Sequence, residues 1–202
     1  MKLFLSIAAA TFTGLAGLGG MVETAAKTQQ VANVKATTEL TAQVAGTMDA
    51  DHFSLLQAVE ETGVPVMINP IDCYEGEMAG VYGFYSYNEA LVICQERGGH
   101  GHLVQMSAED LNTIRHEVVH LIQDLATGTL EDYELTTVYK MNAAFEGWYR
   151  SNVPAHRQEV VEGYNTGEDA CEFTRNIEAE AETVAYTQTA AQVEGMLRQF
   201  IF

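Results

Sequence analysis

Basic residues are scarce in this chain of 202 residues. Lysine and arginine together number 10, against 28 aspartate and glutamate residues, so the formal net charge is −18. The few basic residues do not cluster anywhere in the sequence. Because nucleic acids and anionic membranes are bound through concentrated positive charge, the composition argues against both as partners.

Several motifs that would indicate other functions are missing as well. The chain has no internal repeat, no glycine-rich loop of the phosphate-binding type and no nucleophile elbow. Its length suffices for one compact domain, which we expect at residues 49–202.

The N-terminal residues 1–26 have the features of an export signal. Lys2 provides a short positive start, and Leu3 to Gly20 contains only apolar or small residues. No basic stop-transfer cluster follows, which favours a removed signal peptide over a retained membrane anchor. We therefore expect a secreted or periplasmic protein. Residues 27–48 show no regular hydrophobic period, and we expect them to form a linker or arm.

Cysteine is also rare, with 3 residues. In an exported chain, three cysteines allow one disulfide and leave one thiol. Cys73 and Cys94 flank a predicted pair of strands, so we expect these two to form the disulfide. Cys171 then remains as a thiol, which we expect to be buried and inert.

The hydrophobic pattern of the expected domain predicts the α+β class. A small mixed or antiparallel sheet of about three strands is followed by a helical half. The strands are predicted at residues 64–69, 79–85 and 90–95. The helices are predicted at residues 49–61, 107–128, 131–150, 155–163 and 168–199.

A metal-binding motif lies in the helix predicted after residue 107. His116, Glu117 and His120 form the pattern HExxH, in which the two histidines are four residues apart and share a helix face. Two neutral imidazoles at this spacing can occupy two positions around a zinc ion, and the glutamate beside them can act as general base. Ser107 and Asp110 predict a capping box at the start of this helix.

The other residues of this helix favour a metal site over a solvated surface. An apolar stripe at helical spacing predicts the face that packs into the core, and Gly128 is expected to terminate the helix. The stripe consists of Leu111, Ile114, Val118, Leu121 or Ile122, and Leu125. The two histidines lie on the opposite side, toward a cleft or another helix. Burial without a partner would cost each imidazole a hydrogen bond, whereas a metal would satisfy both.

A pair of carboxylates in the last predicted helix supplies further ligands. Glu178 and Glu182 are four residues apart and share a helix face, where they repel each other unless a cation or histidine lies between them. Ala181 and Ala185 beside them leave room for another helix to approach. Glu180 is a competing ligand on a different face, and we prefer Glu178 because Glu182 stands behind it.

Together these residues resemble the gluzincin metallopeptidases, the thermolysin-like enzymes with an HExxH motif and a glutamate ligand. The resemblance covers residues 107–126 and 172–190, with Glu182 standing where the family usually has aspartate. It implies a zinc ion held by His116, His120 and Glu178. It also implies peptide hydrolysis by water activated by the metal, with Glu117 as general base.

The same resemblance implies that Glu182 or Asp124 accepts a hydrogen bond from the outer nitrogen of a ligand histidine, the ring nitrogen that does not bind the metal. The strand near Leu91–Cys94, if it lies at the sheet edge, would align an extended peptide substrate. The chain is also similar to small secreted cyanobacterial proteins of unassigned function. That likeness rests on a strand pair with cysteines, on Arg115 before the motif and on Gln123–Asp124 after it.

Two alternatives to a gluzincin-type site require other ligands. A metzincin needs a third histidine shortly after His120, and the only later one, His156, is too distant. A non-catalytic zinc protein needs a fourth protein ligand, for which Cys171, His100 or His102 are available. We expect the histidines outside the motif to be solvated, namely His52, His100, His102 and His156.

Overall fold

The computed structural model describes residues 44–201, apart from residues 77, 131–132 and 167–170. The predicted export signal and residues 27–43 of the predicted arm lie outside the described residues. Among the helices that are described, none is both long and apolar enough to span a bilayer.

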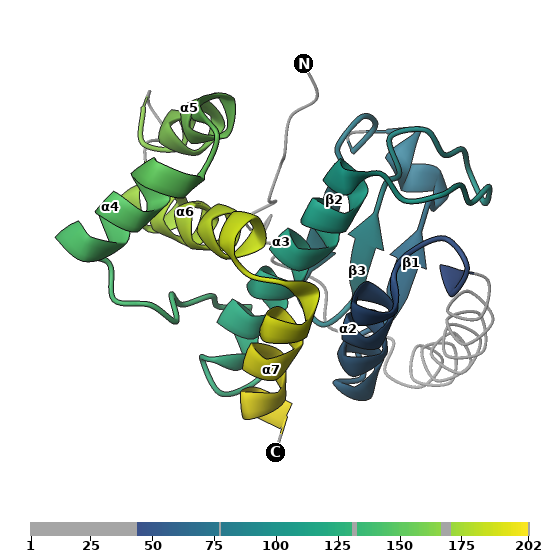
Figure 1. Cartoon of the computed structure of the whole chain (residues 1–202), viewed down its shortest axis with the longest axis horizontal. Coiled ribbons are helices and arrows are strands. Elements are labelled where there is room, and N and C mark those ends of the chain that lie inside the picture. Colours follow the sequence, from purple (N-terminus) through teal and green to yellow (C-terminus); the bar gives the residue numbers. More distant parts are fainter. Residues whose placement is uncertain (1–43, 77, 131–132, 167–170, 202) are drawn as a thin grey trace, which may run out of the picture.

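The described part of the chain contains six α-helices and three strands, which confirms the predicted α+β class. In chain order, the elements are α2 (Ala50–Glu61), β1 (Val66–Ile68), β2 (Gly83–Ser86), β3 (Ala90–Ile93), α3 (Ala108–Leu125), α4 (Ala143–Asn152), α5 (Ala155–Gly163), α6 (Glu172–Thr187) and α7 (Ala190–Ile201). Helix α3 contacts β2 and β3 on one side and α6 and α7 on the other, as Figure 1 shows.

The sheet is mixed, in the order β1-β3-β2. Strand β1 runs parallel to β3, and β2 runs antiparallel to it through a tight turn in which Asn88 has a φ of 55°. Asparagine tolerates this left-handed conformation better than most residues. The strand expected at the sheet edge, β3, is in fact the central strand, so the prediction for Leu91–Cys94 is wrong. The edge that faces α3 belongs to β2.

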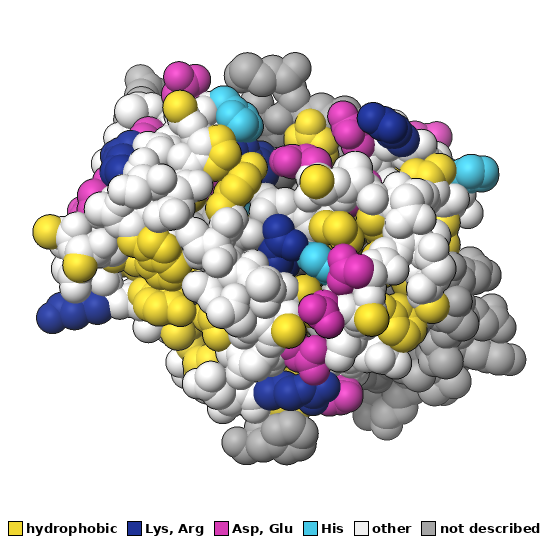
Figure 2. Space-filling model, in the orientation of Figure 1, with side chains coloured by type: hydrophobic (Ala, Val, Ile, Leu, Met, Phe, Trp, Pro, Cys, Tyr) yellow, Lys and Arg dark blue, Asp and Glu magenta, His cyan; other side chains and the backbone are white. Residues whose placement is uncertain are grey.

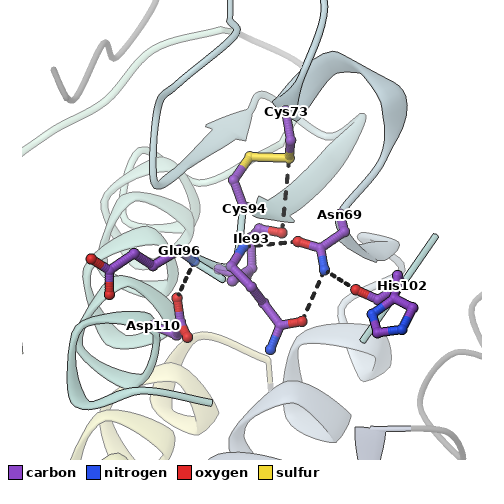
Figure 3. The surroundings of a disulfide bond; sticks show 8 residues. Asn69, Cys73, Ile93, Cys94, Glu96, His102 and Asp110 are labelled. Carbon is purple, nitrogen blue, oxygen red and sulfur yellow. Dashed lines mark hydrogen bonds between the residues drawn. A yellow bond between two sulfur atoms is a disulfide. The ribbon is translucent and has the colours of Figure 1, made fainter. Parts of the chain in front are cut away.

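Helix α3 forms the centre of the core. Its N-terminus has the predicted capping box, in which Ser107 accepts from the backbone N–H of Asp110 and Asp110 accepts from that of Ser107. The same Asp110 carboxylate accepts a hydrogen bond from the backbone N–H of Glu96, just after β3 (Figure 3). This link sets the start of α3 relative to the sheet. Gly128, in the left-handed region at φ 113°, follows the end of the helix as predicted.

Two predicted helices are shorter or divided in the structure. The prediction for residues 131–150 is wrong in its first half, because the described residues 133–142 are irregular and α4 begins only after Asn142. The predicted helix at residues 168–199 is two helices, α6 and α7. Thr189 and Gln192 form a second capping box at the break, with reciprocal backbone–side-chain hydrogen bonds.

The end of the predicted arm belongs to the core. Val44 and Met48 are buried against helices and strands of the main hydrophobic cluster, with exposed fractions of 1% and 8%. The expectation of a loose arm is therefore wrong for residues 44–48. Their apolar side chains are removed from water, which stabilises the fold.

The predicted disulfide between Cys73 and Cys94 is present and joins a short 3-10 turn at Ile71–Cys73 to the end of β3 (Figure 3). Next to it, the buried side chain of Asn69 accepts a hydrogen bond from the backbone N–H of Gln95 and donates one to the carbonyl oxygen of His102. Cys171 is exposed, which corrects the expectation that this thiol is buried. Hydrogen bonds from Thr174 lower the pKa of Cys171.

Replacing both Cys73 and Cys94 with serine should lower the free energy of unfolding by about 3 kcal/mol, because the bond closes a loop with a sequence separation of 21. Urea unfolding of oxidised protein measures the change. The control is Cys171→Ser, which removes an exposed thiol and should alter stability by less than about 0.5 kcal/mol. Equal stability of the double serine variant and the wild type would contradict the prediction.

Candidate metal centre

The packing of α3 against α6 brings the predicted ligands together. His116 and His120 extend from α3 and Glu178 from α6, and all three are at most 2% exposed. Each contributes one ligand atom to a group whose members all lie within 4.8 Å of one another. The two small residues that the sequence singled out, Ala181 and Ala185, are buried at 0% and 1% exposure. Ala181 packs in the same hydrophobic cluster as residues of α3, which agrees with the expected close approach.

The distances between the donor atoms suit a tetrahedral ion. The two Nε2 atoms are 3.1 Å apart, His116 Nε2 lies 3.4 Å from Glu178 Oε2, and His120 Nε2 lies 3.6 Å from Glu178 Oε1. Ligands at zinc distances of about 2.0–2.1 Å in a tetrahedral arrangement lie about 3.3 Å from each other. The three side chains therefore form a group that could hold a metal ion without a change of backbone.

The outer nitrogens of the two histidines face different partners. His116 Nδ1 lies 3.8 Å from Glu182 Oε1, as predicted for Glu182, although this distance is longer than a hydrogen bond. His120 Nδ1 is 2.8 Å from Gln123 Oε1. The role predicted for Asp124 is thus taken by its neighbour, because Asp124 Oδ2 instead accepts a hydrogen bond of 2.5 Å from the hydroxyl of Tyr85.

Glu180 faces away from the ligand group. Its carboxylate accepts hydrogen bonds from the side chain of Gln123 and from the backbone N–H groups of Val138 and Tyr139. These contacts agree with the preference for Glu178 as the ligand. They also explain why the chain around Val138 is not helical as predicted, since its N–H groups bind a side-chain carboxylate instead of helix carbonyls.

The centre contains more negative than positive charge. Glu117, Glu178 and Glu182 are each 2% exposed. Among the described residues, the arginine whose charge acts on Glu117 and Glu182 is Arg157, which is 4% exposed. Arg157 Nε lies 3.3 Å from Glu182 Oε1, and its Nη2 lies 3.3 Å from Glu109 Oε1. With all three buried carboxylates ionised, two negative charges remain, which a divalent cation would neutralise.

The general-base candidate Glu117 is directly affected by this excess of negative charge. Burial, followed by the negative charges of Glu178 and Glu182, raises its pKa well above the ordinary value. The backbone N–H of Tyr85 and the charge of Arg157 act in the opposite direction. A cation bound next to Glu117 would likewise lower the pKa and favour the carboxylate form.

Strand β2 passes close to Glu117 because residue 83 has no side chain. A Cβ atom on Gly83 would lie 2.7 Å from Thr113 Cγ2, 2.7 Å from the carbonyl oxygen of Val92 and 3.2 Å from Glu117 Cγ. Glycine is therefore required at this position for the strand to approach the helix. Gly83 thus allows the short distance between the edge strand β2 and Glu117.

The other histidines and Cys171 do not join the ligand group. Cys171, His100, His102 and His156 are exposed, so among the described residues none of the proposed fourth ligands reaches the centre. His52 is 6% exposed, which corrects the expectation that it is solvated. Its Nδ1 lies 2.8 Å from Asp49 Oδ2 and its Nε2 lies 2.6 Å from Arg115 Nη1.

Three residues of the centre were not anticipated from the sequence. Gln123 follows His120 at a spacing of three, which places it on the same helix face and offers a signal that could have identified it. Arg157 and Gly83 lie 37 and 34 residues from His120 and Glu117 in the chain, and no spacing rule connects them. Only the packing of α5 and β2 brings them to the site.

Comparison of the chain with protein-family models, with curated proteins and with solved structures found no match. The resemblance to gluzincins therefore depends on the residues of the two motifs and stays a prediction. The geometry of the centre is an independent observation, because it follows from the fold and not from a relative.

Gly83→Ala should lower the free energy of unfolding by about 1–3 kcal/mol, because the new methyl group overlaps Thr113 and the backbone of Val92. Urea unfolding measures the loss. Gly147→Ala in α4 is the matched control, since a methyl group there meets nothing within 4 Å and alanine favours a helix interior by up to about 1 kcal/mol. If both variants changed the free energy of unfolding in the same direction, the predicted close approach of β2 to α3 would be contradicted.

Proposed function

We propose that this protein is a zinc-dependent peptidase of the gluzincin type. The observation that carries the proposal is the convergence of His116, His120 and Glu178 at the separations of tetrahedral ligands, with Glu117 beside them. Two imidazoles and one carboxylate are the ligand set of several zinc hydrolases, which keep the fourth position for water or substrate. The absence of a fourth ligand among the described residues agrees with such a site.

The residues of the chain have separate tasks in this proposal. When bound, zinc would supply Lewis acidity, which acidifies water and polarises a substrate carbonyl. Glu117 would accept the proton from water and pass it to the leaving amine. Gln123 would hold the outer nitrogen of His120, and Glu182 would face that of His116.

The substrate would be an extended peptide aligned along β2. This strand forms one edge of the sheet, and the backbone N–H of its residue Tyr85 is directed at the Glu117 carboxylate. A peptide added to that edge would form backbone hydrogen bonds and present its carbonyl group to the general base. The proposed alignment replaces the one expected for β3.

We also propose that the protein acts outside the cytoplasm, as the predicted signal at residues 1–26 implies. The disulfide between Cys73 and Cys94 supports this location, because disulfides form and persist in oxidising compartments.

A second candidate is a non-catalytic protein in which the metal only stabilises the fold. The burial of the three ligands and of Glu117, none more than 2% exposed, favours this alternative. The two candidates predict the same metal content and differ in turnover. The two experiments below separate them.

The purified protein should contain about one zinc ion per chain, and His120→Ala should lose it because one of three protein ligands is removed. Metal analysis after gel filtration measures the content. The matched control is His156→Ala, which replaces an exposed histidine and should keep the zinc. Zinc retained by His120→Ala at the wild-type level would exclude the proposed ligand set.

Glu117→Gln should keep the zinc and lower the rate of peptide cleavage roughly 10²–10⁴-fold, because the amide cannot accept the proton. Cleavage of a library of unstructured peptides, followed by mass spectrometry, measures the rate. The control is Glu159→Gln on α5, an exposed carboxylate. A zinc-loaded Glu117→Gln with full activity would disprove the role of general base. A wild-type protein that binds zinc and cleaves nothing would favour the non-catalytic alternative.

A further inference from the structure

The side chain of Gln123 lies between a metal ligand and a buried carboxylate. Its Nε2 is 2.7 Å from Glu180 Oε2 and 3.0 Å from the carbonyl oxygen of Ile177. Both are acceptors, so the NH₂ group of Gln123 must face them. The amide oxygen then faces His120 Nδ1 at 2.8 Å.

This orientation determines which nitrogen of His120 carries the proton. An amide oxygen only accepts hydrogen bonds, so Nδ1 of the neutral imidazole must be the N–H that donates to it. The lone pair then lies on Nε2, the atom that faces His116 and Glu178. A chain of two hydrogen bonds thus connects Glu180 with the metal-binding atom of His120.

Glu180 also holds the irregular segment at residues 133–142. Its two carboxylate oxygens accept from the backbone N–H groups of Tyr139 at 2.6 Å and Val138 at 3.1 Å. The backbone N–H of Thr136 donates to the carbonyl of Gln123. In Figure 1 this segment leads into the start of α4. One buried carboxylate therefore connects the segment to the helix that bears both histidines.

We propose that Glu180 is a positioning residue of the metal centre. Its carboxylate orients the amide of Gln123, which holds His120 in the tautomer that presents Nε2 to the metal, and it couples residues 133–142 to metal binding. The inference rests on the metal ligation in the proposed function and requires no peptidase activity. Glu180→Gln tests it, because one amide oxygen cannot accept all three donors that the carboxylate accepts.

The first experiment measures the tautomer of His120 by ¹⁵N NMR on zinc-free full-length protein at pH 8. Wild type should show the Nδ1–H form, and Glu180→Gln should show a mixture of both tautomers. Glu172→Gln, an exposed carboxylate on the same helix, should match wild type. A wild-type His120 in the Nε2–H form would overturn the proposal even if the variant does not fold, and so would an unchanged tautomer in Glu180→Gln.

The second experiment measures affinity for zinc alone, by competition with a chromophoric chelator. Glu180→Gln should bind about 10–100-fold more weakly than wild type, as expected for loss of a group that orients a ligand, and Glu172→Gln should bind normally. Zinc should also slow hydrogen exchange of the Val138 and Tyr139 amides in wild type but not in Glu180→Gln, because coupling is reciprocal. Equal zinc affinity in all three proteins would overturn the proposal.

The two proposals fail in different ways. A wild-type protein that binds no zinc would end the proposed function, while the tautomer measurement on zinc-free protein would still decide whether Glu180 sets the tautomer of His120. If the protein binds zinc but cleaves no peptide, the measurements of the His120 tautomer and of zinc affinity still test the role of Glu180.

Discussion

The interface between α3 and α6 has to compensate buried negative charge, and the rest of the structure depends on how it does so. Glu117, Glu178 and Glu182 are almost inaccessible to water and have one buried guanidinium beside them. Burying ionised groups is costly unless opposite charges accompany them. A divalent cation between the two imidazoles and Glu178 would complete the compensation. The same arrangement that would destabilise an ordinary core thereby becomes a reason to infer a metal centre.

The surroundings of α3 hold this centre in a defined geometry. Asp110 joins the start of the helix to the end of β3, and Gly83 allows β2 to approach Glu117. On the other side, Gln123 and Glu180 connect His120 to α6 and to residues 133–142. The face of the molecule in Figure 2 carries acidic side chains in several places, with basic side chains set singly among them. On this face, acidic groups are thus spread over the surface, in addition to those buried at the centre.

Local patterns were reliable where the interaction is itself local. The capping box at Ser107, the bounds of α5 and the terminating Gly128 depend on neighbours within a few residues, and these predictions are confirmed. The predicted disulfide was also correct, because its cysteines flank one strand pair. Predictions failed where a distant group intervened. Glu180 binds backbone N–H groups that would otherwise extend a helix. The break in the long C-terminal helix is an exception, because the capping box of Thr189 and Gln192 is a local contact that was not predicted.

The sequence by itself determined two pairs of side chains, His116 with His120 and Glu178 with Glu182, since a spacing of four residues places each pair on one face of a helix whatever the fold. The α+β class followed from the hydrophobic periods in the same way. Only the tertiary structure decided that the two faces meet at ligand distances, and that Gln123 rather than Asp124 supports His120. Chain spacing cannot specify contacts such as that of Arg157 with Glu182, 25 residues apart. Such contacts arise only when helices pack and exclude the water that would otherwise solvate the charges.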